Sequence, residues 1–394
     1  MSKMAVLYKA ELRKILSKKS VWIALLLSLA LVLLVGFTNF SADGKGAYVK
    51  QQEKTLGAIS GQKMDDEFFE MFHSTVQKEL DEHPDQYNSL LEYDRGEAYK
   101  RAAESAGMKA LYDVIYNTVR SKEAVIDVTA DEFYEKMRKD IESDGLELGC
   151  TQEEVDEWLQ WFDKVEKPIE YSYALPYQNV LDVLFIIGWA LILNIAIALS
   201  GVFADEKTHR TDAMILSAKN GRTPICLVKI AASITAALLQ TLVLLGSCIG
   251  IEFLFYGADG WNAPIQIIIP SSPWNITIGE MILIYAGLAI LSSIFFAITN
   301  MVLSHLTKSA VATMAIHAGI IFAGLFNVPS KLGLIAKLWQ LRPSMALYYG
   351  TFCNTYRYGV FNNVELTTIL YLGLSIILVL FLVLSYKKSQ VQSR

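Results

Sequence analysis

The ionisable side chains that could do chemistry concentrate in residues 203–230, a short polar stretch between two long apolar runs. Its basic residues indicate a cytosolic loop, because such loops carry an excess of Lys and Arg. An apolar cluster inside it predicts a short amphipathic helix at the membrane edge. The stretch is either a contact surface for a cytosolic partner or a solvated hairpin joining two spans. The residues concerned are Asp205, Glu206, Lys207, Arg210, Thr211, Met214, Ile215, Leu216 and Arg222.

Motifs for enzymatic chemistry are absent from the sequence. It has no GxxxxGK[ST] phosphate loop, no HExxH zinc motif and no GxSxG nucleophile elbow. The five histidines are scattered, so we expect no metal, no bound cofactor and no catalytic residue in this chain. Cys226 and Cys248 lie in one apolar run. Whether Cys150 and Cys353 form a disulfide is not decided by their spacing.

A few polar residues fall within or beside the apolar runs. His317 lies near the middle of one run, and an ionisable group there marks a pathway or relay by default. We favour the alternative of a neutral histidine that is hydrogen-bonded to a neighbouring helix. Asn300 is expected to hold helices together. The candidates for a pathway or gate are His317, Asn300, Glu252 and Leu338.

The apolar runs explain why 53% of the 394 residues are hydrophobic. A bilayer-spanning helix needs about 20 apolar residues, and six runs approach or exceed that length. They predict an all-α polytopic membrane protein with six transmembrane helices, both termini cytosolic, and a cytosolic tail at residues 387–394. The predicted spans are residues 21–38, 180–202, 225–256, 278–303, 310–327 and 366–386.

Residues 1–20 combine basic side chains with apolar residues at helical spacing. This pattern predicts an amphipathic helix that lies on the inner leaflet of the membrane. Its basic face would contact the lipid head groups. A cleaved signal peptide is the competing interpretation, and we favour an uncleaved first span. The basic residues of this helix are Lys9, Arg13, Lys14 and Lys18.

Residues 39–177 form a long polar insertion between the first two spans, with 31 acidic and 16 basic residues. Capping-box spacings at Thr129/Glu132 and Thr151/Glu154 predict helix starts, so we expect a mostly helical extracytoplasmic domain with an aromatic core. The rest of the chain carries a net charge of +10. It contains no basic patch with interleaved aromatic residues, so the sequence argues against nucleic-acid binding.

The pattern of residues 329–350 predicts an outer helix that is either interfacial or re-entrant.

The order of these elements, together with the polar stretch, resembles the permease subunit of ABC-2 type exporters. The matching residues are Phe203-Ala-Asp-Glu206, Thr211, Leu216-Ser217, Arg222 and Lys229. Family members commonly have a Gly-Thr pair where this chain has Arg210-Thr211, and often a proline where it has Ala218-Lys219.

The resemblance implies that a separate ABC ATPase, which binds ATP and Mg²⁺, docks on residues 204–224 and on the N-terminal helix. Asp205, Glu206, Lys207 and Arg210 would contact the ATPase, and the cluster from Met214 to Leu216 would fill its groove. A second permease copy or a paralogue would complete the path, and the helix at 329–350 would gate it.

Exporters of this kind with a large external domain often handle peptides, including antimicrobial peptides in Gram-positive bacteria. An acidic domain suits a cationic peptide. We therefore expect a multi-pass protein of a Gram-positive plasma membrane that exports a peptide or amphiphile. The alternative is a membrane sensor or assembly protein whose external domain binds a ligand or partner.

Overall fold

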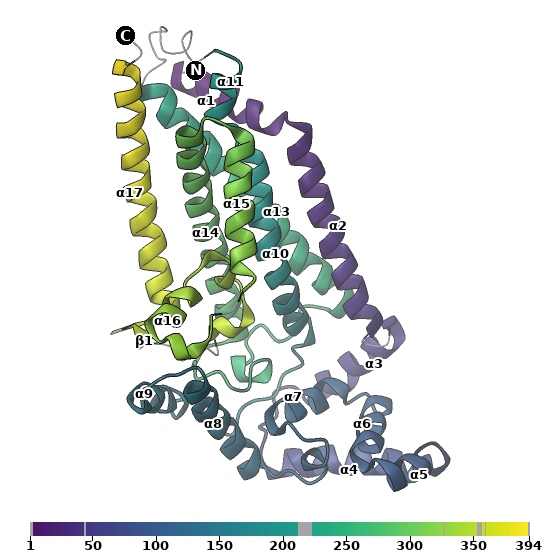
Figure 1. Cartoon of the computed structure of the whole chain (residues 1–394). Coiled ribbons are helices and arrows are strands. Elements are labelled where there is room, and N and C mark those ends of the chain that lie inside the picture. Colours follow the sequence, from purple (N-terminus) through teal and green to yellow (C-terminus); the bar gives the residue numbers. More distant parts are fainter. Residues whose placement is uncertain are drawn as a thin grey trace.

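The computed structural model describes residues 3–42, 45–211, 223–326, 328–352, 357–358 and 360–392. Long helices run side by side, and a group of shorter helices covers one end of them (Figure 1). Both chain termini lie at the opposite end. We call these two ends the domain end and the terminal end.

Among the described residues, five helices are long and apolar enough to cross a membrane. Their lengths follow from the apolar runs, since a continuous apolar stretch can bury backbone hydrogen bonds only as a helix. The third of them has 34 residues and a length of about 51 Å, more than the roughly 30 Å of hydrocarbon. The five are α2 (Lys19–Ala42), α10 (Leu175–Leu199), α13 (Thr223–Tyr256), α14 (Ile278–Thr307) and α17 (Asn363–Gln392).

The prediction of six full spans is not confirmed. The predicted span at residues 310–327 is α15 (Ala310–Gly324), a helix of 15 residues that is only about 22 Å long. It ends at Gly324 because the following chain turns back: Trp339 Nε1 donates to Phe326 O, and Arg342 Nε donates to Gly324 O.

Short elements take the place of the single helix that we expected over residues 329–350. The chain there forms a string of turns at the domain end (Figure 1). A hairpin of two antiparallel two-residue strands follows it, with Tyr358 opposite Phe361. The elements are η3 (Ser330–Leu332), α16 (Leu334–Gln340), η4 (Pro343–Met345), η5 (Tyr349–Phe352), β1 (Arg357–Tyr358) and β2 (Phe361–Asn362).

The insertion between α2 and α10 folds into a helical domain at the domain end. Both predicted capping boxes form, at Thr129/Glu132 and at Thr151/Glu154. Its aromatic residues form a core, as expected, with Phe72 and Phe162 fully buried. Its helices are α3 (Lys45–Ala58), α4 (Asp66–Glu82), α5 (Pro84–Tyr93), α6 (Arg95–Ser105), α7 (Lys109–Val119), η1 (Ala124–Ile126), α8 (Ala130–Glu147) and α9 (Gln152–Phe162).

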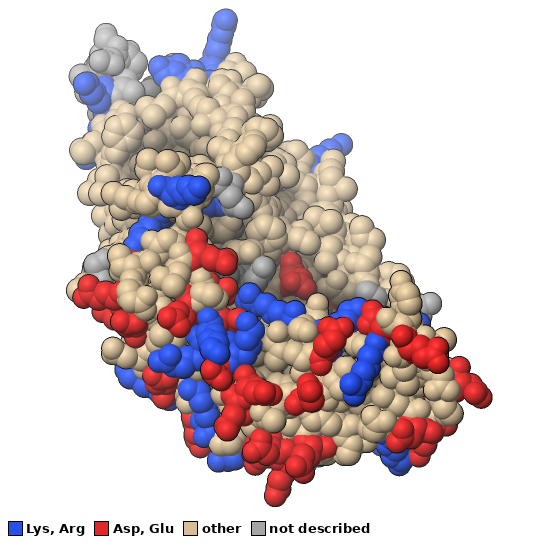
Figure 2. Space-filling model, turned by 60° about the horizontal axis from the view of Figure 1, so that its bottom comes forward, with Lys and Arg blue, Asp and Glu red and all other residues tan. Residues whose placement is uncertain are grey.

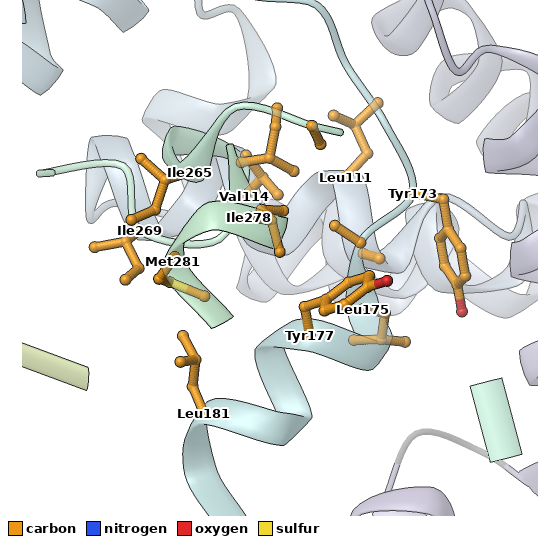
Figure 3. Close-up of a cluster of buried hydrophobic side chains, with 14 of the residues drawn as sticks. Leu111, Val114, Tyr173, Leu175, Tyr177, Leu181, Ile265, Ile269, Ile278 and Met281 are labelled. Atoms are coloured by element: carbon orange, nitrogen blue, oxygen red, sulfur yellow. The ribbon is translucent and has the colours of Figure 1, made fainter. Parts of the chain in front are cut away.

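Charged side chains crowd the surface of this domain, whereas the bundle surface in the same view is mostly uncharged (Figure 2). The domain joins the bundle through a continuous apolar core. Val114 of α7 and Tyr173 lie in one cluster with Ile265 of η2 (Ile265–Ile267) and with Met281 of α14 (Figure 3). The domain therefore packs directly on the bundle.

Aromatic and ionic contacts fix this junction. The Trp274 ring lies 6.0 Å from Trp158 and 5.6 Å from Trp161 of α9, and 5.4 Å from Phe352. Glu154 forms an ion pair with Lys337 of α16. Burial raises the pKa of the Glu154 carboxyl, but the hydrogen bonds from Lys337 and Thr151 outweigh burial and hold the pKa below its ordinary value.

Candidate functional site

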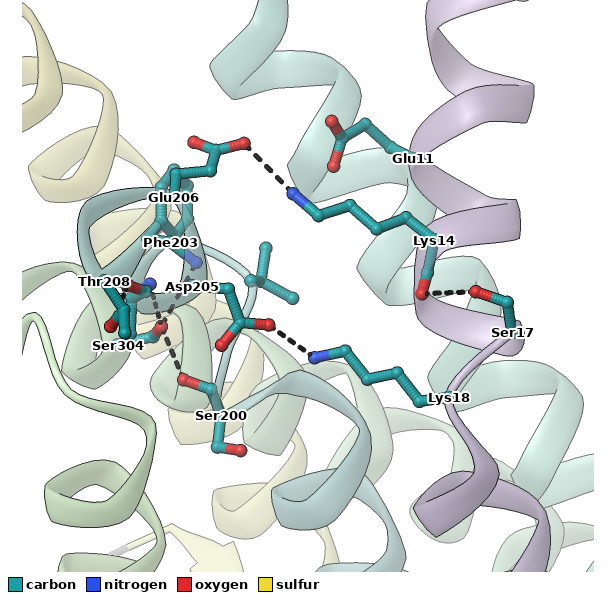
Figure 4. Close-up of polar contacts among 12 residues, drawn as sticks. Glu11, Lys14, Ser17, Lys18, Ser200, Phe203, Asp205, Glu206, Thr208 and Ser304 are labelled. Atoms are coloured by element: carbon teal, nitrogen blue, oxygen red, sulfur yellow. Dashed lines mark hydrogen bonds and ion pairs between the residues drawn. The ribbon is translucent and has the colours of Figure 1, made fainter. Parts of the chain in front are cut away.

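The candidate site is the turn that follows α10 at the terminal end, residues 200–211, which we call the elbow. It contains the five-residue helix α11 (Ala204–Thr208). Ser304, a buried residue near the end of α14, fixes its position: Ser304 Oγ accepts from Phe203 N at 3.2 Å and from Ala204 N at 3.1 Å, and donates to Ser200 O at 2.7 Å. The elbow is thus attached to α14 as well as to α10 (Figure 4).

A glycine makes room for the first acidic residue of the elbow. A Cβ atom at Gly201 would lie 2.3 Å from both carboxylate oxygens of Asp205, closer than atoms can approach. Asp205 Oδ2 accepts from Lys18 Nζ at 2.9 Å. Lys18 follows α1 (Lys3–Leu16), so this ion pair joins the N-terminal helix to the elbow (Figure 4).

Glu206 is part of a larger ion cluster. Its Oε1 lies 2.6 Å from Lys229 Nζ and 3.3 Å from Lys14 Nζ. Lys229 Nζ also lies 2.8 Å from Glu11 Oε2 and donates to Val202 O at 3.1 Å. We call Glu11, Lys14, Glu206 and Lys229 the tether cluster. It connects α1, the elbow and α13.

The tether cluster is balanced in charge, and Lys229, Glu206 and Glu11 within it are removed from water. The Lys229 side chain is 0% exposed, and those of Glu206 and Glu11 are 7% and 14% exposed. A lone ammonium at this depth would be strongly destabilising, and two carboxylates together with a backbone carbonyl compensate it. Removing Lys229 therefore leaves Glu11 and Glu206 without the ammonium that they share.

The N-terminal helix also packs on α13 through other contacts. Tyr8 OH donates to Thr235 Oγ1 at 2.8 Å, and Ile15 is buried in the apolar cluster of the terminal end. Lys14 and Lys18, which we expected on the inner leaflet, bind carboxylates of the elbow. Lys9 and Arg13 are exposed.

The structure shows contacts of the elbow residues that were not expected from the sequence. Asp205 and Glu206 were expected to contact an ATPase, yet the structure pairs both with lysines of this chain, and Glu206 is buried. Lys207 and Arg210 are exposed and Thr211 is half-buried. The remaining predicted residues, Met214, Ile215, Leu216 and Arg222, lie outside the described residues.

Arg210 has a φ of 55°, in the left-handed region that favours glycine. This conformation gives a physical reason for the glycine that family members commonly have at this position. Arg210→Gly is expected to keep or slightly raise the thermal stability of the protein, because it removes about 1 kcal/mol of backbone strain. Thermal unfolding in detergent measures this.

The matched control is Lys207→Gly, which lies inside α11 and should lower stability by about 1 kcal/mol. If both glycine variants lowered the unfolding temperature equally, Arg210 would not be under strain.

The last turns of α14 and α17 complete the terminal end. His305 Nε2 lies 3.0 Å from Ser385 Oγ, and the Phe203 ring lies 5.7 Å from both His305 and Tyr386. Five elements therefore meet around the elbow: α1, α10, α13, α14 and α17. A displacement of the elbow would be transmitted to all of them.

The four pathway or gate candidates do not form one site. His317 is buried, and its Nδ1 contacts Thr313 O of its own helix, so the expected bond to a neighbouring helix is not seen in the described residues. Asn300 Nδ2 donates to Ile195 O at 3.5 Å, between α14 and α10. Glu252 is buried near the domain end of α13, whereas Leu338 on α16 is 52% exposed.

Comparison with known proteins decides the family. A family model described as "ABC-2 family transporter protein" matches residues 5–390. The chain belongs to the ABC-2 family of transporter proteins. No curated protein and no solved structure gave a significant match. As an ABC-2 permease it is a multi-pass membrane protein, and its family implies association with an ABC ATPase.

Sequence reasoning missed the residues that hold the elbow. Lys229 was named only as one of the residues that match the ABC-2 family. Glu11, Gly201 and Ser304 were given no role. One signal was available: Lys229 is a charged residue inside an ABC-2 span, and such a charge requires partners. The sequence could not name those partners, because Glu11 and Lys229 lie 218 positions apart.

Proposed function

We propose that this chain is the membrane subunit of an ABC exporter and that a separate ATPase chain docks at the terminal end. The tether cluster is the main support for this proposal, because it links the elbow to α1 and α13 in an ABC-2 permease. The exposed residues of the elbow, from Lys207 to Arg210, are available to a partner there. The terminal end then faces the cytosol and the helical domain faces outward.

The charge distribution supports this orientation. Residues 1–20 carry six basic residues, and the elbow with the segment that follows it carries four more. Cytosolic segments of membrane proteins show this excess. The helical domain has a net charge of −15, and long translocated domains do not follow the rule.

In the proposed mechanism, a movement of the ATPase is transmitted to the membrane helices through the elbow. ATP-driven closure of the ATPase shifts the elbow, and Lys229 passes that shift to α13 while Ser304 passes it to α14. At the domain end, Trp274 in the loop before α14 and Lys337 of α16 contact the helical domain. Helix tilting would therefore open the turns at residues 329–352, which serve as the outer gate.

The substrate we propose is a cationic peptide or amphiphile, exported across a Gram-positive plasma membrane. A cleft of about 520 Å³ lies between the helical domain and the loop that joins α13 to α14. Three carboxylates line it, from Glu166, Glu170 and Asp259, against one lysine, Lys63. Such a cleft attracts cations, and the indole of Trp261 can contact them by cation–π interaction.

Co-purification tests the proposal. A tagged chain, extracted gently from its native membrane, is expected to bring down a Walker-motif ATPase in near-equal amount. Lys207→Glu should reduce the recovered ATPase several-fold, because it reverses a charge on the exposed face of the elbow. Lys54→Glu, an exposed reversal on the helical domain, is the control and should change nothing. Recovery of no ATPase, or equal loss in both variants, would contradict the proposal.

A further inference from the structure

An apolar cavity of about 290 Å³ lies between α10, α14, α15 and the turn after α16. Its walls include Ile192, Phe296, Ile321, Trp339, Arg342 and Pro343. It is distinct from the elbow and from the acidic cleft, since it shares no lining residue with either. Three of the four elements around it are apolar helices of the bundle.

The depth of this cavity limits what can occupy it. α16 lies at the domain end of the bundle (Figure 1), so the cavity belongs to the half of the membrane on that side. Hydrocarbon chains of the bilayer surround the bundle at this level. An empty apolar cavity forfeits dispersion contacts with its lining, so an alkyl chain from the bilayer is a favourable occupant.

Arg342 adds a specific polar group to the cavity wall. Its Nε donates to Gly324 O at 3.2 Å and its Nη1 to Trp339 O at 2.8 Å, and the guanidinium lies 5.3 Å from the Trp339 ring centre. Its Nη2 is buried and has no hydrogen-bond acceptor among the residues that the structure describes. The ionisable neighbour is Tyr371, whose hydroxyl donates to Leu341 O.

The guanidinium and the apolar cavity beside it suit the two parts of an anionic lipid. The unused donor can bind the phosphate, and the cavity can hold an acyl chain. Buried donors without an acceptor are destabilising, and a phosphate oxygen would satisfy this one. Because Nε and Nη1 already donate to backbone carbonyls, Nη2 is the donor left for a phosphate oxygen, and a guanidinium keeps its positive charge when it is buried.

We propose that this cavity binds an anionic phospholipid from the domain-side leaflet, with one acyl chain in the cavity and its phosphate on Arg342. The site lies away from the elbow and does not depend on the proposed partner ATPase. Lipid bound there would pack between α15 and the turns at 329–352, and would influence how those turns move.

Photo-crosslinking of the full chain in vesicles tests this site. One set of phosphatidylcholine vesicles contains phosphatidylglycerol with a photoreactive acyl chain, and the other contains phosphatidylcholine with the same chain. The phosphatidylglycerol probe is expected to label cavity peptides of α10 and α15 about ten-fold more than the phosphatidylcholine probe. Arg342→Gln should remove that excess, and Arg342→Lys should retain part of it.

Lys331→Gln is the control, since it removes an exposed positive charge from the same segment. It should leave the labelling unchanged. If Arg342→Gln is not recovered folded, Ile321→Trp replaces it: this variant fills the cavity and should abolish labelling there. Equal labelling by both probes, a phosphatidylglycerol excess that persists in Arg342→Gln, or labelling that persists in Ile321→Trp would overturn the proposal.

Discussion

Replacing Lys229 with methionine is expected to destabilise the protein by about 3–5 kcal/mol. The substitution keeps most of the apolar volume and removes the ammonium that Glu11 and Glu206 share. Two carboxylates would then remain buried near one another, with Lys14 as the partner left to Glu206. We expect α1 to separate from α13, which thermal unfolding in detergent and proteolysis of residues 3–16 would both report.

The control for this variant is Lys3→Met, which removes an exposed lysine from the same N-terminal helix. It should shift the unfolding temperature little, since exposed charges contribute little to stability. The double variant Lys229→Met/Glu206→Gln should recover part of the loss, because one buried charge is removed with its partner. Equal stability of Lys229→Met and the native chain would show that the tether cluster does not hold α1.

Trp274→Ala is expected to loosen the helical domain from the bundle at a cost of about 2–3 kcal/mol, less than a fully buried tryptophan because Trp274 is half-buried. Its ring contacts Trp158 and Trp161 on one side and Phe352 on the other. The domain keeps its own core, so its helices should stay folded. Trypsin cleavage after Lys164, in the exposed segment beside this junction, should increase several-fold.

Tyr93→Ala is the matched control, since Tyr93 on α5 is 92% exposed and distant in sequence from the junction. It should leave cleavage after Lys164 unchanged. If Trp274→Ala also left cleavage unchanged, the aromatic contacts would not be what docks the domain.

The elements that could be predicted from the sequence depend on local information. A long apolar run can satisfy its backbone in a bilayer only as a helix, so α2, α10, α13, α14 and α17 follow from composition. The capping boxes at Thr129 and Thr151 depend on side chains three residues apart, and both form.

What could not be predicted depends on contacts between distant residues. The run at 310–327 is mostly apolar, but α15 ends at Gly324, where Arg342 contacts the chain from 18 positions away. The partners in the tether cluster are likewise set by the packing of α1 on α13. The sequence pattern therefore placed Lys14 on the inner leaflet, and the family resemblance placed Glu206 against an ATPase.

The most direct test of the account is photo-crosslinking from single positions in native membranes. A photoreactive amino acid replaces Lys207 on the elbow in one variant and exposed Glu92 on the helical domain in another. We expect position 207 to crosslink to a Walker-motif ATPase and position 92 not to do so. An ATPase crosslinked from position 92, or none from position 207 in membranes that contain the intact complex, would contradict it.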